Sequence, residues 1–217
     1  MKKKHITIIL LTAFIGMASG QTFEGKITYQ VNYKSKHPNV QDQQFNSMMG
    51  TIQEYIIKGG DYKYSFNGAV MQWQLYNSKE NRLYNKMSNS ESVQWNDAGN
   101  NPDKVISVVV NKGVTEILGY KCDELIMTCK SGIQKYYFNE KIAVDISLFK
   151  NHTYGNWYEY LKVAKALPLK SIIDTPQFVV ESVATEITAM EIDDKEFQLP
   201  KNAKPAKSPY ATKEKLK

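Results

Sequence analysis

Residues 23–34 alternate strictly between two kinds of side chain. Every second position is apolar, aromatic or glycine, and these positions are Phe23, Gly25, Ile27, Tyr29, Val31 and Tyr33. The positions between them are polar or charged. A period of two places successive side chains on opposite faces of a β-strand. The segment therefore predicts a strand with one buried face and one solvated face.

Short strand-forming runs continue along the chain, separated by residues that favour turns. Residues 51–58 and 62–66 flank Gly59, Gly60 and Asp61, which predicts a tight hairpin. Further runs occupy 70–76, 82–87, 92–95, 104–110, 114–118, 122–130, 133–138, 169–174 and 177–192. The run 104–110 is apolar on both faces, which favours a central strand. Connections this short predict antiparallel pairing.

Helical signals are few. The polar stretch 35–46 predicts a loop, with a short helical piece expected near Met48. A second helical segment is expected between Ile146 and Ala166, broken around 151–156 and ended before Pro168. The pattern predicts a mainly β (α+β) fold of about ten strands, arranged as a curved antiparallel sheet or barrel with one or two helices.

The first 20 residues have the three parts of an export signal. The cations Lys2, Lys3 and Lys4 precede the apolar run 6–17, and small residues fill 18–20. A run of about 12 residues is short for a spanning helix, which needs roughly 20. We expect cleavage before Gln21 rather than an uncleaved anchor or a buried helix. No cysteine near this junction could take a lipid, so a soluble protein is expected in the periplasm of a Gram-negative bacterium or outside the cell.

Residues 21–200 are expected to form a single β-rich domain, because no Pro/Gly/Ser-rich linker divides them. The formal net charge of +6 is concentrated at the two ends. Three lysines lie in the export signal, and residues 201–217 carry six lysines against Glu214 alone. The body is slightly acidic, which argues against a nucleic-acid partner. The Lys-rich segment 201–217 is expected to be a disordered tail.

The two cysteines admit two states. An even number of cysteines in an oxidising compartment suggests a disulfide. However, Cys122 and Cys129 lie on one predicted strand with no turn residue between them. Seven steps of about 3.3 Å place them over 20 Å apart, far beyond disulfide range. Buried free thiols are therefore favoured over the disulfide.

Catalytic and metal-binding patterns are scarce. His37 and His152 lie in predicted loops, where a solvated side chain is more common than a general base. Neither a nucleophile elbow nor a zinc spacing occurs. The acidic residues of 191–196 lack the spacing of a calcium loop and indicate a solvated turn. We therefore expect no enzyme, no metal and no cofactor, although a carboxylate pair of the glycosidase type stays open.

Aromatic and methionine side chains are abundant on the strands of the first half. They suit the wall of a cavity for an apolar ligand, and they suit an ordinary β-sheet core equally well. The cavity candidates are Tyr29, Tyr55, Tyr64, Met71, Trp73, Tyr84 and Trp95.

Several short motifs together resemble a known family. They are Phe-Glu-Gly-Lys-Ile-Thr-Tyr at 23–29, Gly-Tyr-Lys-Cys at 119–122, Tyr-Tyr-Phe at 136–138, Leu-Pro-Leu-Lys at 167–170 and Phe-Gln-Leu-Pro at 197–200. In this layout the chain is similar to exported Bacteroidetes-type proteins of the DUF4412 kind, which are related in architecture to outer-membrane lipoprotein carriers. The resemblance implies a half-open barrel with a helical lid over an apolar cavity. It implies no catalytic residue.

We therefore expect a non-enzymatic periplasmic binding module for a lipid or a lipoprotein acyl chain, with transient contact to a membrane or an envelope protein. The alternative is a structural or interaction protein of the cell envelope that has a filled core and no small ligand.

Overall fold

The computed structural model describes residues 22–209, and these form one twelve-stranded sheet, mostly antiparallel and not closed into a barrel. The order across the sheet is β12-β6-β5-β4-β3-β2-β1-β11-β10-β9-β8-β7. The strands of the first half are β1 (Gly25–Ser35), β2 (Ile52–Lys58), β3 (Asp61–Phe66), β4 (Met71–Asn77), β5 (Arg82–Met87) and β6 (Val93–Asp97). Those of the second half are β7 (Val105–Ile117), β8 (Tyr120–Cys129), β9 (Gly132–Ala143), β10 (Ala166–Asp174), β11 (Phe178–Ala189) and β12 (Pro205–Lys207). The mainly β prediction is confirmed, and the expected export signal lies outside the described residues.

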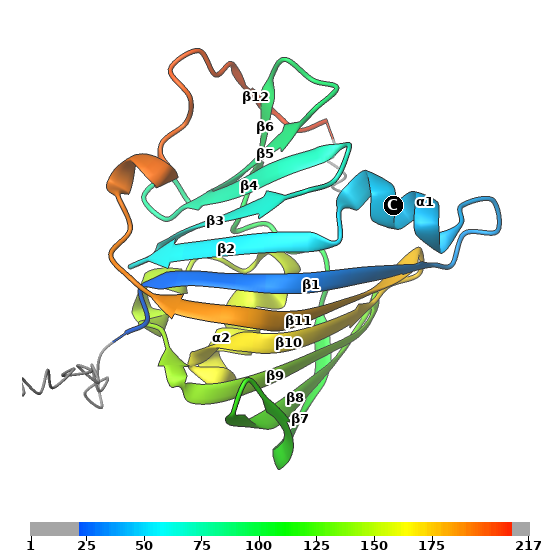
Figure 1. Ribbon diagram of the computed structural model, residues 1–217, viewed down its shortest axis with the longest axis vertical. Helices are drawn as coiled ribbons and strands as arrows, with labels where there is room; N and C mark the ends of the chain where they lie inside the picture. Colours follow the sequence, from blue (N-terminus) through cyan, green and yellow to red (C-terminus); the bar gives the residue numbers. More distant parts are fainter. Residues whose placement is uncertain (1–21, 210–217) are drawn as a thin grey trace, which may run out of the picture.

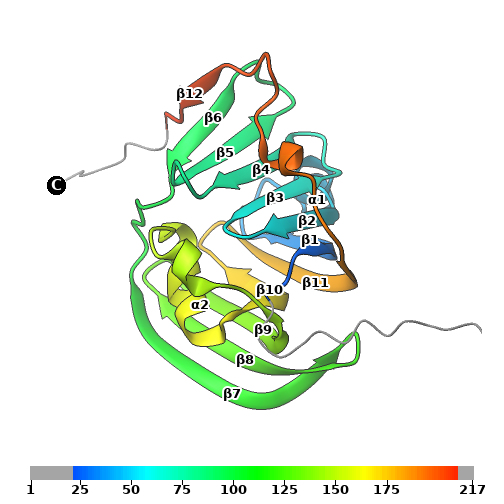
Figure 2. The ribbon, with the colours of Figure 1, turned by 90° about the vertical axis from the view of Figure 1, so that its left-hand side faces the viewer.

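Two α-helices, α1 (Asp42–Met49) and α2 (Trp157–Ala164), accompany the described sheet. Short 3₁₀ helices η1 (Ile146–Phe149), η2 (Tyr154–Asn156) and η3 (Asp194–Phe197) complete the elements. The sheet curls around α2, so the helix lies inside its concave face (Figures 1 and 2). No helix among residues 22–209 is both long and apolar enough to cross a membrane.

Strand β1 lies near the middle of the sheet, and its alternating apolar and polar residues face the core and the solvent in turn. Ile27, Tyr29, Val31 and Tyr33 are buried, while the residues between them are partly or fully exposed. Antiparallel pairing with β2 and β11 satisfies both of its edges. The predicted hairpin is also confirmed, because Lys58 pairs with Asp61 across Gly59, which adopts a φ of 56°.

Hydrophobic side chains pack on both faces of the sheet. On the concave face, Tyr160, Leu161 and Ala164 of α2 are buried against residues of β1, β2, β8, β9 and β10. On the convex face, a smaller cluster joins Leu75, Tyr84 and Val93 to Ile192 and to Phe197 of η3. The sheet therefore has a main core under α2 and a second core under η3.

The prediction of a central strand at 104–110 is wrong. Strand β7 is the last strand of the sheet, and among the described strands it pairs with β8 alone. Its residues from Ile106 to Lys112 are all exposed, and 69% of the surface of Ile106 is accessible to solvent. Apolar side chains on both faces of a strand are also found where no second layer covers the sheet, and sequence alone does not separate these two cases.

Part of the segment expected to be a disordered tail is ordered. Residues 205–207 form β12, which pairs in parallel with 93–95 of β6. Ala203, just before β12, packs against the convex core. Backbone pairing with a sheet edge stabilises a segment whose own side chains bury little surface. Residues 210–217 lie outside the described chain.

Both cysteines are buried free thiols, which confirms the favoured prediction. Burial raises the pKa of Cys129 to about 11 and also raises the pKa of Cys122.

Candidate functional site

The seven cavity candidates do not surround one cavity. Tyr29, Tyr55 and Tyr64 pack with the concave core, whereas Trp73, Tyr84 and Trp95 belong to the convex core. Met71 lies on the concave face beside Met87. A register shift between Met71 and Trp73 explains why two residues of equal parity lie on opposite faces.

Tyr29 and Tyr55 are part of a filled core rather than a cavity wall. The Tyr29 hydroxyl donates a hydrogen bond to the carbonyl of Pro168 at 2.8 Å. The ring of Tyr55 packs 4.6 Å from that of Tyr64 and 5.4 Å from that of Tyr62, measured between centroids. Among the candidates, Tyr64 alone reaches the small cavity of about 210 Å³ that Tyr62, His152 and Trp157 also line.

His152 is buried, so the expectation of a solvated loop histidine is wrong for this residue. Its Nε2 lies 2.6 Å from the hydroxyl of Tyr62, and its ring packs against Tyr76 at 4.3 Å. Removal from water lowers its pKa to about 3. The ring therefore stays neutral at physiological pH and is hydrogen-bonded to a tyrosine. We interpret it as part of the packed core and not as a general base. His37, in contrast, is exposed in its loop.

The acidic segment 191–196 is held by lysines. Asp194 lies 2.8 Å from Lys58, and Glu196 lies 3.2 Å from Lys63. The hydrogen bond from Lys58 lowers the pKa of Asp194. Within residues 22–209, no group of three or more His, Cys, Asp or Glu side chains is placed to hold a metal ion.

A groove of about 830 Å³ opens between the far strands and α2. We call it the β7–α2 groove. Its apolar wall comprises Val110 of β7, Phe138 of β9, and Val163 and Ala164 of α2. The rest of the lining is made of three lysines, two acids, a glycine and an asparagine, which are Lys112, Lys121, Lys165, Asp123, Glu140, Gly113 and Asn139.

The valines of β7 on the groove side are identified by their pairing. Val108 and Val110 stand opposite Met127 and Leu125, which are buried in the concave core. Val109 stands opposite Ile126 and therefore points to the convex face. Val110 keeps 37% of its surface exposed and Val109 keeps 51%.

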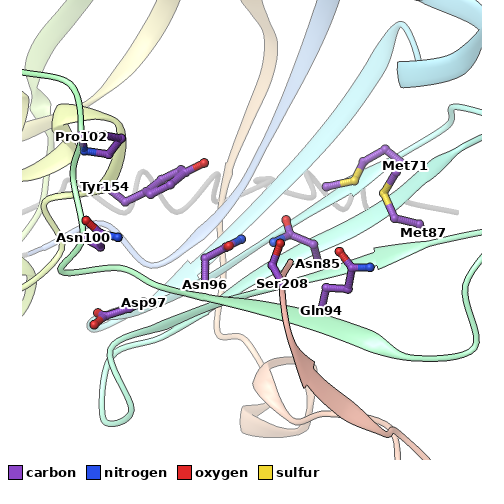
Figure 3. A pocket seen from close by; sticks show the side chains of 10 residues that line it. All are labelled: Met71, Asn85, Met87, Gln94, Asn96, Asp97, Asn100, Pro102, Tyr154 and Ser208. Atoms are coloured by element: carbon purple, nitrogen blue, oxygen red, sulfur yellow. The ribbon is translucent and has the colours of Figure 1, made fainter. Parts of the chain in front are cut away.

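A second pocket, of about 430 Å³, lies on the concave face of β4, β5 and β6, beyond the reach of α2. We call it the carboxamide pocket, after Asn85, Gln94, Asn96 and Asn100. Figure 3 shows Asn85, Gln94 and Asn96 in a row along the strands, with Tyr154 and Pro102 at one end and Met71 and Met87 at the other. Asp97 and Ser208 also line it. Apart from Met71, the sequence analysis missed these residues.

Comparison with known proteins gives little. No family model matches the chain, and no curated protein matches it. Among solved structures, PNGF-II in space group P21 is similar with a TM-score of 0.47 and 16% identity. PNGF-II in space group C2 is similar with a TM-score of 0.42 and 15% identity. The alignments cover 86% and 84% of this chain but only 32% and 31% of the other. The chain thus spans about a third of the length of PNGF-II, and we draw no functional conclusion from a likeness this distant.

Proposed function

We propose that this chain is an exported, non-enzymatic binding module that holds the acyl chain of a lipid or lipoprotein in the β7–α2 groove. The observation that carries the proposal is the exposed apolar wall of the groove. Val110 on β7 and Val163 on α2 each leave over a third of their surface exposed. Covering such surface releases about 25 cal/mol for each Å² removed from water. An apolar chain would supply that cover.

The size and charge of the groove favour a ligand with an apolar body and an anionic end. A volume of about 830 Å³ lies within the range of small-molecule sites. Lys121 and Lys165 line the groove, and neither makes an ion pair among the described residues. Lys112, in contrast, lies 2.6 Å from Asp123. Two unpaired cations beside an apolar wall suit a carboxylate or a phosphate at the end of an acyl chain.

A second candidate is a structural or interaction protein of the envelope. The packing under α2 favours it, because Tyr160, Leu161 and Tyr55 fill the centre of the concave face. A protein of this kind would bind no acyl chain, so a direct binding measurement separates the two candidates.

The test is titration of the full-length mature protein with a dansyl-labelled fatty acid, followed by fluorescence. In Val110→Gln a polar amide enters the apolar wall. In the matched control Val109→Gln the same change is made on the opposite face of the same strand. An amide left unpaired against an acyl chain costs about 1–3 kcal/mol, which corresponds to roughly 5-fold to 150-fold weaker binding.

We expect the wild type and Val109→Gln to bind the probe equally, and Val110→Gln to bind it about fivefold to 150-fold more weakly. If the wild type does not bind the probe, or if both variants lose binding equally, the acyl-chain proposal is wrong. Native mass spectrometry of protein from its own host should also reveal a co-purified lipid.

A further inference from the structure

The carboxamide pocket has a chemistry different from that of the β7–α2 groove. Its central residues are neutral amides, and no lysine or arginine among residues 22–209 lines it. The side chains of Gln94, Asn96 and Asn100 make no hydrogen bond with any residue in the range 22–209. A purely apolar ligand would leave these groups unpaired and is therefore disfavoured on energetic grounds. A phosphate or a nucleic acid would find no cation among the described residues of this pocket.

The amides offer both donors and acceptors at short spacing. Each carboxamide carries two N–H donors and a carbonyl oxygen with two lone pairs. Gln74 donates to Oδ1 of Asn85 at 2.8 Å, which fixes that amide and leaves its NH₂ group for a ligand. Oδ1 of Asp97 accepts from the backbone N–H of Gly99 at 2.8 Å, and its second oxygen adds an acceptor. A hydroxyl group is both donor and acceptor, so a ligand with several neighbouring hydroxyls matches this array.

Tyr154 supplies an aromatic wall whose position is fixed. Its side chain is 43% exposed and lies at one end of the pocket (Figure 3). The backbone N–H groups of Thr153 and Tyr154 both donate to the carbonyl of Ala98, at 2.9 and 2.8 Å. The Thr153 hydroxyl donates to the carbonyl of Gly99 at 2.8 Å. These bonds tie the segment that carries Tyr154 to the loop that carries Asn100.

The two residues after Tyr154 have an unusual backbone conformation. Gly155 and Asn156 both adopt left-handed conformations, with φ values of 63° and 64°. Asn156 is buried, and its Oδ1 accepts a hydrogen bond from Asn101 at 2.7 Å. Left-handed conformations at non-glycine residues cost free energy and persist where the surroundings hold them. The ring of Tyr154 is exposed, and hydrogen bonds hold the segment that carries it. Such a ring is suited to contact a ligand rather than to fill a core.

From this arrangement we propose that the carboxamide pocket binds a neutral carbohydrate. The amides and Asp97 pair with ring hydroxyls, and the ring of Tyr154 packs against the apolar C–H face of a sugar. The pocket volume of about 430 Å³ lies within the range of small-ligand sites. This site is independent of the β7–α2 groove, so either can exist without the other.

The test begins with the mature protein on an array of neutral and acidic oligosaccharides. The strongest neutral glycan is then titrated by calorimetry into the wild type and three variants. Asn96→Leu removes hydrogen-bonding capacity at similar volume, and Tyr154→Ala removes the aromatic wall. Gln72→Leu is the matched control, since Gln72 is an exposed amide on β4 that does not line the pocket. Thermal unfolding of each variant confirms that it folds.

We expect the wild type and Gln72→Leu to bind the neutral glycan alike. Asn96→Leu and Tyr154→Ala should each bind at least tenfold more weakly. Tyr154→Phe should retain most of the affinity, because it keeps the ring. The proposal is overturned if the array shows no neutral glycan bound, if only acidic glycans bind, or if folded Asn96→Leu and Tyr154→Ala bind as tightly as the wild type.

Discussion

The burial of His152 predicts a specific loss of stability in mild acid. The side chain is 2% exposed, and its nearest polar partner is the neutral hydroxyl of Tyr62. Its Nδ1 has no hydrogen-bond partner among the described residues. In the part of the chain that the structure describes, no carboxylate compensates a positive charge on the ring, so desolvation lowers its pKa to about 3.

The size of the effect follows from the difference between folded and unfolded pKa values. Well above pH 6.5 the imidazole is neutral in both states and contributes no pH dependence. As the pH falls below 6.5, the unfolded chain binds a proton that the folded chain does not, and folding loses about 1.4 kcal/mol per pH unit. Between pH 6.5 and pH 5 the loss is therefore about 2 kcal/mol. Carboxyl groups with lowered pKa values, such as Asp123 and Asp194, add their own losses below this range.

The assay is urea unfolding at several pH values between 7 and 5, followed by tryptophan fluorescence. His152→Gln keeps a polar side chain that is neutral throughout. We expect this variant to be less stable than the wild type at pH 7, since it loses ring packing, but to lose about 2 kcal/mol less on going to pH 5. His37→Gln is the control and should follow the wild type. An unchanged pH dependence in His152→Gln would refute the burial argument.

Three further predictions concern the fold. Gly132→Ala should destabilise the protein by more than Gly119→Ala in chemical denaturation, because a Cβ at Gly132 would lie 2.0 Å from the Asp174 carbonyl oxygen and one at Gly119 meets nothing within 4 Å. Equal losses would contradict this. The two cysteines should resist iodoacetamide in the native protein and react after unfolding, as measured by mass spectrometry, since both are buried. Leu161→Ala should cost about 2–5 kcal/mol of unfolding free energy in urea, because it opens a cavity at a fully buried position of α2.

Local patterns in the sequence predicted the parts of the fold that local physics determines. The alternation from Phe23 to Tyr33 identifies β1 and its buried face, and Gly59 with Gly60 marks the first hairpin. The break at 151–156 in the late helical segment is also present, between η1 and α2. Each of these depends on residues within one turn or one strand.

The features that the sequence did not reveal depend on distant parts of the chain. Val108 and Val109 suggest a central strand, yet β7 ends the sheet, and no other strand within residues 22–209 pairs with its free edge. His152 lies in a loop, yet Tyr62 and Tyr76 from β3 and β4 enclose it. The register shift after Met71 places Met71 and Trp73 on opposite faces of the sheet, and no residue at this point of the sequence predicts a bulge. For this reason the seven cavity candidates lie on both the concave and the convex face of the sheet.

The carboxamide pocket was missed for a reason that concerns the length of α2. Polar residues at alternate positions of β5 and β6 suggest a strand face turned to solvent outside the fold. Here Asn85, Gln94 and Asn96 share the concave face with Leu83 of the main core. Helix α2 has eight residues, so it is about 12 Å long, and it contacts β8, β9 and β10. A helix this short cannot also cover β4 to β6. The amides on the inner face mark where the helical cover ends, and that boundary makes the concave face of this sheet accessible to a polar ligand.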